Sequence, residues 1–173
     1  MSEIQKYLIT PAEVRSIRQV SQYVEDKKVE TYISESENLD IKPNLGDALF
    51  IDIKDHPENY DTLLNGGIYE TTCGDKKSFS GLKTALNYYA YARLMKNGDY
   101  NVTRFGVVNK QGEWSNPSDY KEKVTAYNDA FSVADSYLKE CVVYLNDNKE
   151  KFKLYKGKGG VKANRTIYKI LGD

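Results

Sequence analysis

The pattern of apolar positions is strongest between residues 79 and 110, and we take this stretch as the one around which the chain folds. From Ser80 to about Lys96, apolar residues recur at helical spacing on one stripe and also fill most of the remaining surface. A helix that is apolar nearly all round is usually buried, with neighbours on several sides. Arg93 falls on the main stripe, so its guanidinium must find a carboxylate or reach water along its stem. The sequence predicts a buried central helix that Gly98 ends in the left-handed conformation.

A short extended arm is predicted directly after this helix. Residues 100–108 are mostly β-branched or aromatic, a composition that favours a strand. Residues 109–112 then turn the chain, and Glu113 and Trp114 are the candidate hairpin partner. Such an arm can offer unpaired backbone groups to a neighbouring chain, although an internal hairpin is the simpler alternative.

A second long helix is predicted after residues 116–119, a cap followed by a first-turn proline and an acid. Its apolar residues alternate in steps of four and three, which predicts a seam for lengthwise packing on the central helix. The seam consists of Tyr120, Val124, Tyr127, Phe131, Ala134, Leu138, Cys141 and Leu145. Cys141 is therefore interpreted as a small hydrophobic residue of the core.

The N-terminal part predicts four short helices, over about 11–23, 25–38, 45–54 and 57–64. The first opens with a capping box, Thr10-Pro11-Ala12-Glu13, and the third is capped by Asn44 or Asp47. Residues 39–43 are expected to be an extended link, because the residue before Pro43 is driven out of the helical region. A strand over 68–73 and a turn or loop over 74–77 precede the central helix.

These elements predict a mainly α fold: a helical bundle with a long C-terminal helix packed on a central helix, plus a small β-hairpin or extended arm. We expect one helical domain over residues 1–152, with the β arm near 98–115. Residues 153–173 are expected to form a flexible basic tail.

The charges add an asymmetry to this picture. The chain has no net charge, which argues against bulk attraction to nucleic acid or membrane. Residues 1–75 nevertheless carry 7 Lys and Arg against 15 Asp and Glu, a net of −8, whereas residues 149–173 carry 8 against 2, a net of +6. The two ends could meet within one molecule, join one subunit to the next, or be two solvated surfaces.

Candidate chemistry is sparse. The single histidine, His56, precedes Pro57 and is best interpreted as a turn residue. Cys73 and Cys141 match no zinc or redox spacing, which indicates free thiols in a reducing compartment. The glycine-rich stretch at 157–160 lacks the Lys-Ser/Thr ending of a phosphate loop. With no long apolar run and no signal-peptide pattern, we expect a soluble, cytoplasmically made protein without enzymatic activity, cofactor or metal.

The basic tail combines charge with a last apolar segment. Charge alone would let it contact a nucleic-acid backbone, but a solvated or protein-docking tail is favoured. The basic residues are Lys156, Lys158, Lys162 and Arg165, and the apolar segment holds Ile167, Tyr168, Ile170 and Leu171.

The order of these elements resembles the head–tail connector (adaptor) proteins of tailed bacteriophages. The likeness covers about residues 10–150. It rests on short acidic helices with a turn at Leu45-Gly46, the stretch 66–70 (GGIYE), and the helix 81–93 (GLKTALNYYAYAR) leading into an arm and a long helix. The closest likeness is to the versions in phages of Bacteroides-type hosts, including the crAss-like phages.

The resemblance implies a virion structural protein at the head–tail interface, made in the host bacterial cytoplasm. About twelve copies would form a ring around the DNA channel and join the portal protein to the next tail protein. DNA would pass through without sequence-specific binding, and no membrane would be involved. The expected contact residues are Tyr100, Val102, Arg104, Phe105, Val107, Lys156, Lys158, Lys162, Arg165, Ile167, Tyr168, Ile170 and Leu171.

Two alternatives remain at this point. One is a small non-enzymatic module whose tyrosine-rich surface binds a protein or a nucleic acid. The other is an enzyme that uses Cys73, or a pair of carboxylates with a metal.

Overall fold

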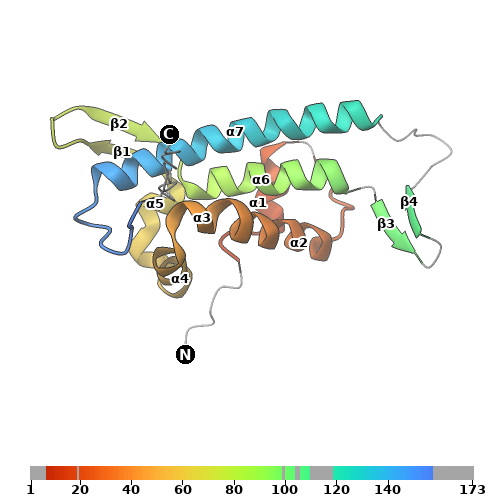
Figure 1. Ribbon diagram of the computed structural model, residues 1–173, viewed down its shortest axis with the longest axis horizontal. Helices are drawn as coiled ribbons and strands as arrows, with labels where there is room; N and C mark the ends of the chain where they lie inside the picture. Colours follow the sequence, from red (N-terminus) through yellow and green to blue (C-terminus); the bar gives the residue numbers. More distant parts are fainter. Residues whose placement is uncertain (1–6, 19, 99, 104–105, 110–118, 158–173) are drawn as a thin grey trace, which may run out of the picture.

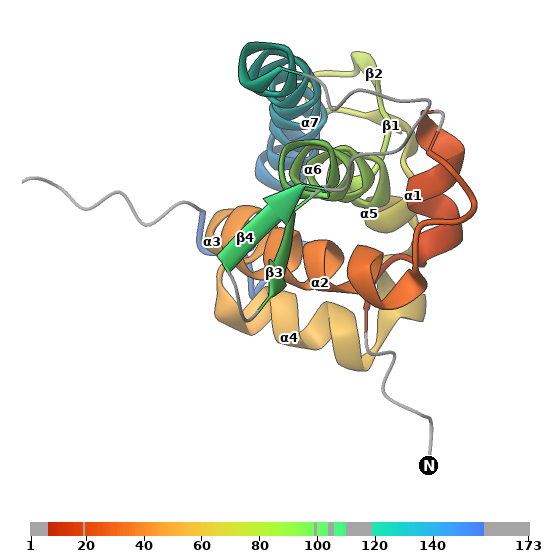
Figure 2. The same ribbon diagram turned by 90° about the vertical axis from the view of Figure 1, so that its right-hand side faces the viewer.

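A computed structural model describes residues 7–18, 20–98, 100–103, 106–109 and 119–157. The described chain is mainly helical, and its longest helix, α7 (Tyr120–Asp147), packs along the central helix α6 (Leu82–Asn97) (Figure 1). The predicted fold class is confirmed. The remaining helices lie on the other side of α6 from α7 (Figure 2).

The α6–α7 contact forms the centre of the core. Leu82, Leu86 and Tyr89 of α6 are fully or almost fully buried, as the all-round apolar pattern predicts. On α7, the buried seam residues are Ala134, Leu138, Cys141 and Leu145. Tyr120 is 65% exposed, so the seam does not begin at the first turn as expected. The cause is length, because α7 has 28 residues and α6 has 16, so α7 runs past its partner.

The first N-terminal helix is shorter than predicted. α1 (Pro11–Ile17) has the predicted capping box at Thr10 and Glu13 but ends well before the expected limit at about residue 23. Arg18, which follows it, has extended backbone and reaches Asp129 on α7, where Nη1 lies 3.0 Å from Oδ2. This tertiary contact outweighs the local helical pattern.

The predicted extended link at 39–43 is wrong. α2 (Asp26–Ser36) continues as a π-helix, η1 (Glu37–Ile41), and then as α3 (Lys42–Leu45), with Lys42 in the helical region. The wider π turn explains why Pro43 is tolerated, because its ring would clash with the carbonyl four residues earlier in a regular α-helix.

The predicted caps of the third helix are also wrong. α4 (Asp47–Asp55) begins after Gly46, whose φ of 84° is readily adopted only by glycine. Asn44 instead donates its side-chain amide to the Asp40 carbonyl at 2.6 Å. The break at His56 and Pro57 is confirmed, and η2 (Pro57–Tyr60) and α5 (Asp61–Asn65) follow it.

Two antiparallel hairpins replace the single predicted one. β1 (Gly67–Glu70) pairs with β2 (Lys76–Phe79), so the strand expected over 68–73 is shorter and the expected turn or loop at 74–77 overlaps a strand. β3 (Tyr100–Thr103) pairs with β4 (Gly106–Asn109), so the expected single strand over 100–108 is itself a hairpin. The expected partner residues Glu113 and Trp114 lie outside the described residues. Gly106 is the first residue of β4, and a glycine inside a strand pattern often marks a break in that pattern.

Gly66 and Gly81 bring the β1–β2 hairpin back to the core. A Cβ on Gly66 would lie 2.5 Å from the Phe79 carbonyl oxygen, and one on Gly81 would lie 2.4 Å from the Gly66 nitrogen. Both have φ near 80°. Only glycine fits at this crossing of two backbone segments. At the other end of α6, Gly98 has φ of −62°, so the predicted left-handed ending is wrong.

Candidate interaction surfaces

The β3–β4 hairpin extends from the C-terminal end of α6 and forms one end of the described structure (Figure 1). We call this hairpin the arm. In the backbone register of the two strands, Val102 is paired with Val107 and Tyr100 is paired with Asn109. The main described contacts of the two strands are with each other. Its base is tied to α2, because the Lys28 ammonium donates a hydrogen bond to the Gly98 carbonyl. Of the predicted arm residues, Arg104 and Phe105 lie outside the described residues.

The β1–β2 hairpin lies at the opposite end and is fixed to α7 by stacked rings. The Phe79 and Tyr144 rings stack with centroids 4.4 Å apart, and the Tyr69 ring meets Tyr144 edge-on at 4.9 Å. The ring of Phe152, in the turn after α7, meets the Tyr144 ring edge-on with centroids 5.6 Å apart. These four side chains, which we call the aromatic joint, connect the hairpin, α7 and the chain that follows it. Sequence analysis missed this joint, although the high tyrosine count was a signal of it.

A carboxylate of α7 strengthens the same attachment. Asp147 Oδ2 accepts hydrogen bonds from Lys77 Nζ and from the Tyr69 hydroxyl, each at 2.9 Å. Lys77, and after it Tyr69, hold the pKa of Asp147 below its usual value. Burial, together with the bond to Asp147, raises the pKa of Tyr69 to about 12. Both shifts favour the paired state near neutral pH.

A shallow groove of about 370 Å³ lies between this hairpin and α7, lined by Tyr69, Lys77, Ser78, Lys139, Glu140 and Val143. Ile68 is 75% exposed on the same hairpin, and Val143 is 42% exposed. Exposed apolar side chains beside a groove are typical of surfaces that contact other proteins.

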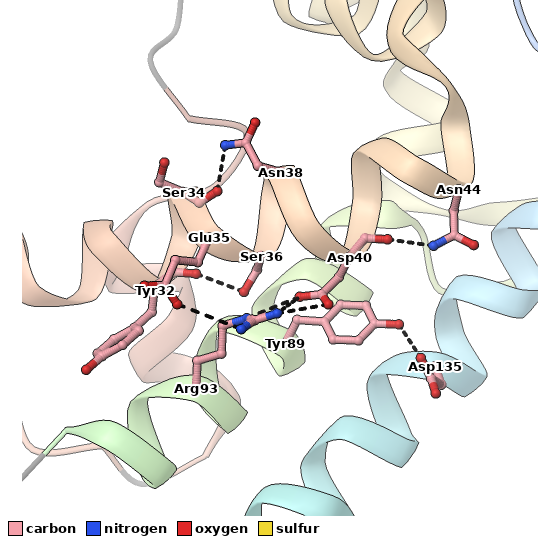
Figure 3. A network of polar contacts seen from close by, with 10 residues as sticks. All are labelled: Tyr32, Ser34, Glu35, Ser36, Asn38, Asp40, Asn44, Tyr89, Arg93 and Asp135. Carbon is pink, nitrogen blue, oxygen red and sulfur yellow. Dashed lines mark hydrogen bonds and ion pairs between the residues drawn. The ribbon is translucent and has the colours of Figure 1, made fainter.

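A polar network fastens the middle of the molecule (Figure 3). Arg93 donates hydrogen bonds to Asp40 of η1, from Nη2 to Oδ2 at 2.8 Å and from Nε to Oδ2 at 3.2 Å. Arg93 Nη1 also lies 3.8 Å from Glu35 Oε2. Beside it, the Tyr89 hydroxyl donates to Asp135 of α7 at 2.5 Å. The expectation that Arg93 finds a carboxylate is confirmed.

The network ties η1, α6 and α7 together at an electrostatic cost. Burial raises the pKa of Asp40, and its bonds to Arg93 oppose that shift without cancelling it. Burial, followed by the bond to Asp135, raises the pKa of Tyr89. The side chains are satisfied by one another, which is characteristic of a structural network in a packed interior.

The remaining predicted contact residues divide between the described and undescribed parts of the chain. Lys156 is exposed just beyond Phe152 and Tyr155, whose side chains are 9% and 6% exposed. The others lie outside the described residues: Lys158, Lys162, Arg165, Ile167, Tyr168, Ile170 and Leu171.

The two cysteines and the histidine occupy different surroundings. Cys141 is fully buried, which confirms its core interpretation, and burial raises its pKa to about 12. Cys73 is exposed in the β1–β2 turn. His56 Nδ1 lies 3.3 Å from Asp52 Oδ1 at the end of α4. Within the described ranges, no three His, Cys, Asp or Glu side chains are grouped as a metal site would need.

Comparison with known proteins gives one match. A model described as a family of unknown function (DUF6712) matches residues 41–165. The chain belongs to this family. The DUF6712 match includes α6, α7 and both hairpins, which are the elements that form the two ends of the molecule. No curated protein and no solved structure matches the chain. In the part of this DUF6712 protein that the structure describes, no helix has the length and apolar character needed to cross a membrane.

Proposed function

We propose that the protein is a virion structural protein, a portal-proximal head–tail connector subunit of a tailed bacteriophage. About twelve copies would form a ring around the DNA channel and join the portal protein to the next tail protein. The proposed function involves no catalysis and no cofactor. The observation that carries it is the position of the arm and the β1–β2 hairpin at opposite ends of the α6–α7 pair (Figure 1).

A ring subunit needs two different contact surfaces, because each copy touches one neighbour on each side through unlike patches. The two hairpins meet this requirement, since they differ in sequence and lie far apart on one helical body. Among the described residues, neither hairpin pairs with a third strand, so the outer edges of both can add a strand from a neighbour.

The helical body between the hairpins supports the same proposal. Its core is continuous from α2 to α7, and the Arg93–Asp40 pair fixes η1 against α6. A rigid body of this kind holds two contact surfaces at a constant distance and angle, which closure of a ring requires. The basic tail adds a third contact, to the portal or to the next tail protein.

The test is the native mass of the full chain, measured against protein concentration with and without the cognate portal protein. The proposal expects a closed ring, either alone or when the portal is present as a template. A chain that stays monomeric and does not bind the portal would contradict it.

A nucleic-acid titration completes the test. Under the proposal, the assembled ring binds DNA without sequence preference and only weakly at physiological salt. Tight binding by the monomer, falling steeply as salt is added, would instead identify a nucleic-acid-binding module.

A further inference from the structure

The solvent side of α4 and of the turn after it is acidic, with one large apolar side chain at its centre. Asp47, Ile51 and Asp55 recur every four residues and therefore share one face of α4. Ile51 is 55% exposed on that face, and the exposed Glu58 follows in η2. We call this surface, residues 47–61, the acidic face.

Two carboxylates of the acidic face have no ionic partner in the described part of the chain. Asp47 lies 3.5 Å from Lys42 Nζ, whereas no described cation pairs with Asp55 or Glu58. An exposed isoleucine among such carboxylates matches a partner that is basic and apolar at once.

The turn after α7 contacts this face through the ring of Phe152. The Phe152 ring stacks on Tyr60 of η2 with centroids 6.1 Å apart, and the Tyr60 hydroxyl donates a hydrogen bond to Asp52 of α4. Tyr155 is buried three residues later. In Figure 1, the turn after α7 descends beside α5 and α4. The described chain ends at Gly157, five residues after this contact.

The composition of residues 158–173 complements that surface. The segment holds Lys158, Lys162, Arg165 and Lys169 against one acid, Asp173, and it carries four large apolar residues between positions 167 and 171. From Gly157 to Lys162, an extended chain spans about 17 Å. This exceeds the length of α4, whose nine residues rise about 14 Å.

We propose that residues 158–173 dock on the acidic face of their own chain. Lys162 and Arg165 lie against the carboxylates of Asp55 and Glu58, and the apolar residues cover Ile51. Docking within one chain is favoured over docking on a neighbour, because a short tether gives a local concentration in the millimolar range. This inference goes beyond the proposed function, since it concerns the free subunit, before its tail contacts the portal or the next tail protein.

The test places a spin label in the segment and detects its neighbours by NMR. The full-length chain carries Cys73→Ser, which removes the exposed thiol, and Asn164→Cys, which receives the nitroxide; the buried Cys141 stays unlabelled. We expect the amide signals of residues 47–61 to lose intensity relative to the reduced label. We also expect the loss to be largely reversed in high salt, where the Debye length falls to about 3 Å.

A charge-reversal pair and a matched control sharpen the test. Asp55→Lys with Glu58→Lys should restore the intensities at low salt, while Asp75→Lys with Glu122→Lys, which changes two exposed acids elsewhere, should leave the loss unchanged. The unlabelled amide spectrum of each variant reports whether the fold is retained. Full intensity over 47–61 in the labelled parent, or equal effects of the two pairs, would overturn the proposal.

A mixed sample separates docking in one chain from docking between chains. Isotope-labelled chains without nitroxide are combined with unlabelled chains that carry it. Docking within the chain predicts no intensity loss at residues 47–61 in this sample. A loss as large as in the sample where one chain carries both isotope and nitroxide would assign the segment to a neighbouring chain and overturn the proposal. That outcome would not decide whether the protein binds the portal.

Discussion

The two hairpins have the same four-residue antiparallel ladder but are attached to the helical body in different ways. The β1–β2 hairpin is fixed by the aromatic joint and by the two hydrogen bonds to Asp147. The arm joins α6 through its base at Gly98, and its strands contact chiefly each other.

The difference indicates a division of labour between the two ends. An isolated two-stranded hairpin is marginally stable in water, so the arm has most to gain from an additional contact. The β1–β2 hairpin is already part of the core and offers a preformed surface. In the proposed ring, the arm is therefore the element that adapts, and the β1–β2 end is the rigid platform.

The largest effect is expected at the aromatic joint. Tyr144→Ala removes the ring that contacts Phe79, Tyr69 and Phe152 together, and should lower the free energy of unfolding by about 3–5 kcal/mol. Urea denaturation of the variant and the parent measures this loss. Tyr120→Ala, at the exposed start of the same helix, is the control and should change stability by less than about 0.5 kcal/mol. Equal losses would show that the joint has no special role.

A smaller but clear loss is expected where the β1–β2 hairpin returns to the core. Gly81→Ala places a Cβ against the Gly66 backbone at a positive φ, which should cost about 2–3 kcal/mol. The matched control is Gly74→Ala in the turn of the same hairpin. There φ is also positive but the nearest atom is 4.0 Å away, so only the backbone strain of about 1 kcal/mol remains. Thermal unfolding that gives the same change for both variants would exclude the close approach as the cause.

The helical part of the fold was largely predictable, because a long periodic pattern averages over many residues. α6 and the packed part of α7 each provide several turns of consistent spacing, and Arg93 on a buried stripe already required a carboxylate. The identity of that carboxylate was not predictable. Asp40 lies within residues 39–43, where Pro43 led us to predict an extended link. The π turn that accommodates Pro43 within a helix depends on packing.

The short strands were harder to predict for a physical reason. β2 contains one apolar residue, Phe79, so its alternation carries almost no signal, and its pairing with β1 is set by the aromatic joint. The candidate arm was located correctly from its composition, whereas its division into two paired strands was not predicted. Composition identifies a strand but not the residue at which the chain reverses.

A pH titration should affect the fixed hairpin on the alkaline side. The pKa of Tyr69 is raised to about 12 in the folded protein, above the usual value near 10. Its contribution to stability is therefore complete below pH 10 and disappears as the pH rises from about 10 to 12. Tyr69→Phe should make stability decline less steeply in this range, as measured by thermal unfolding at each pH. Parallel curves for parent and variant would contradict the assigned pKa.

The smallest effect on stability, and the largest on assembly, is expected in the arm. Replacing residues 100–109 by a Gly-Ser linker of the same length should change the unfolding free energy of the monomer by less than about 1 kcal/mol, because few core contacts are lost. The same replacement should abolish assembly on the portal. Urea denaturation and native mass measure the two effects, and a strongly destabilised monomer would show that the arm belongs to the core.

The most direct test of the account mixes subunits with and without the arm. In a head-to-tail ring each copy must use both ends, so an armless copy can end an arc but cannot continue it. Native mass spectra of assemblies formed on the portal, with increasing fractions of armless chains, should show closed rings giving way to shorter arcs. Rings that form with the full subunit number at every fraction would contradict the claim that the two ends join neighbouring copies.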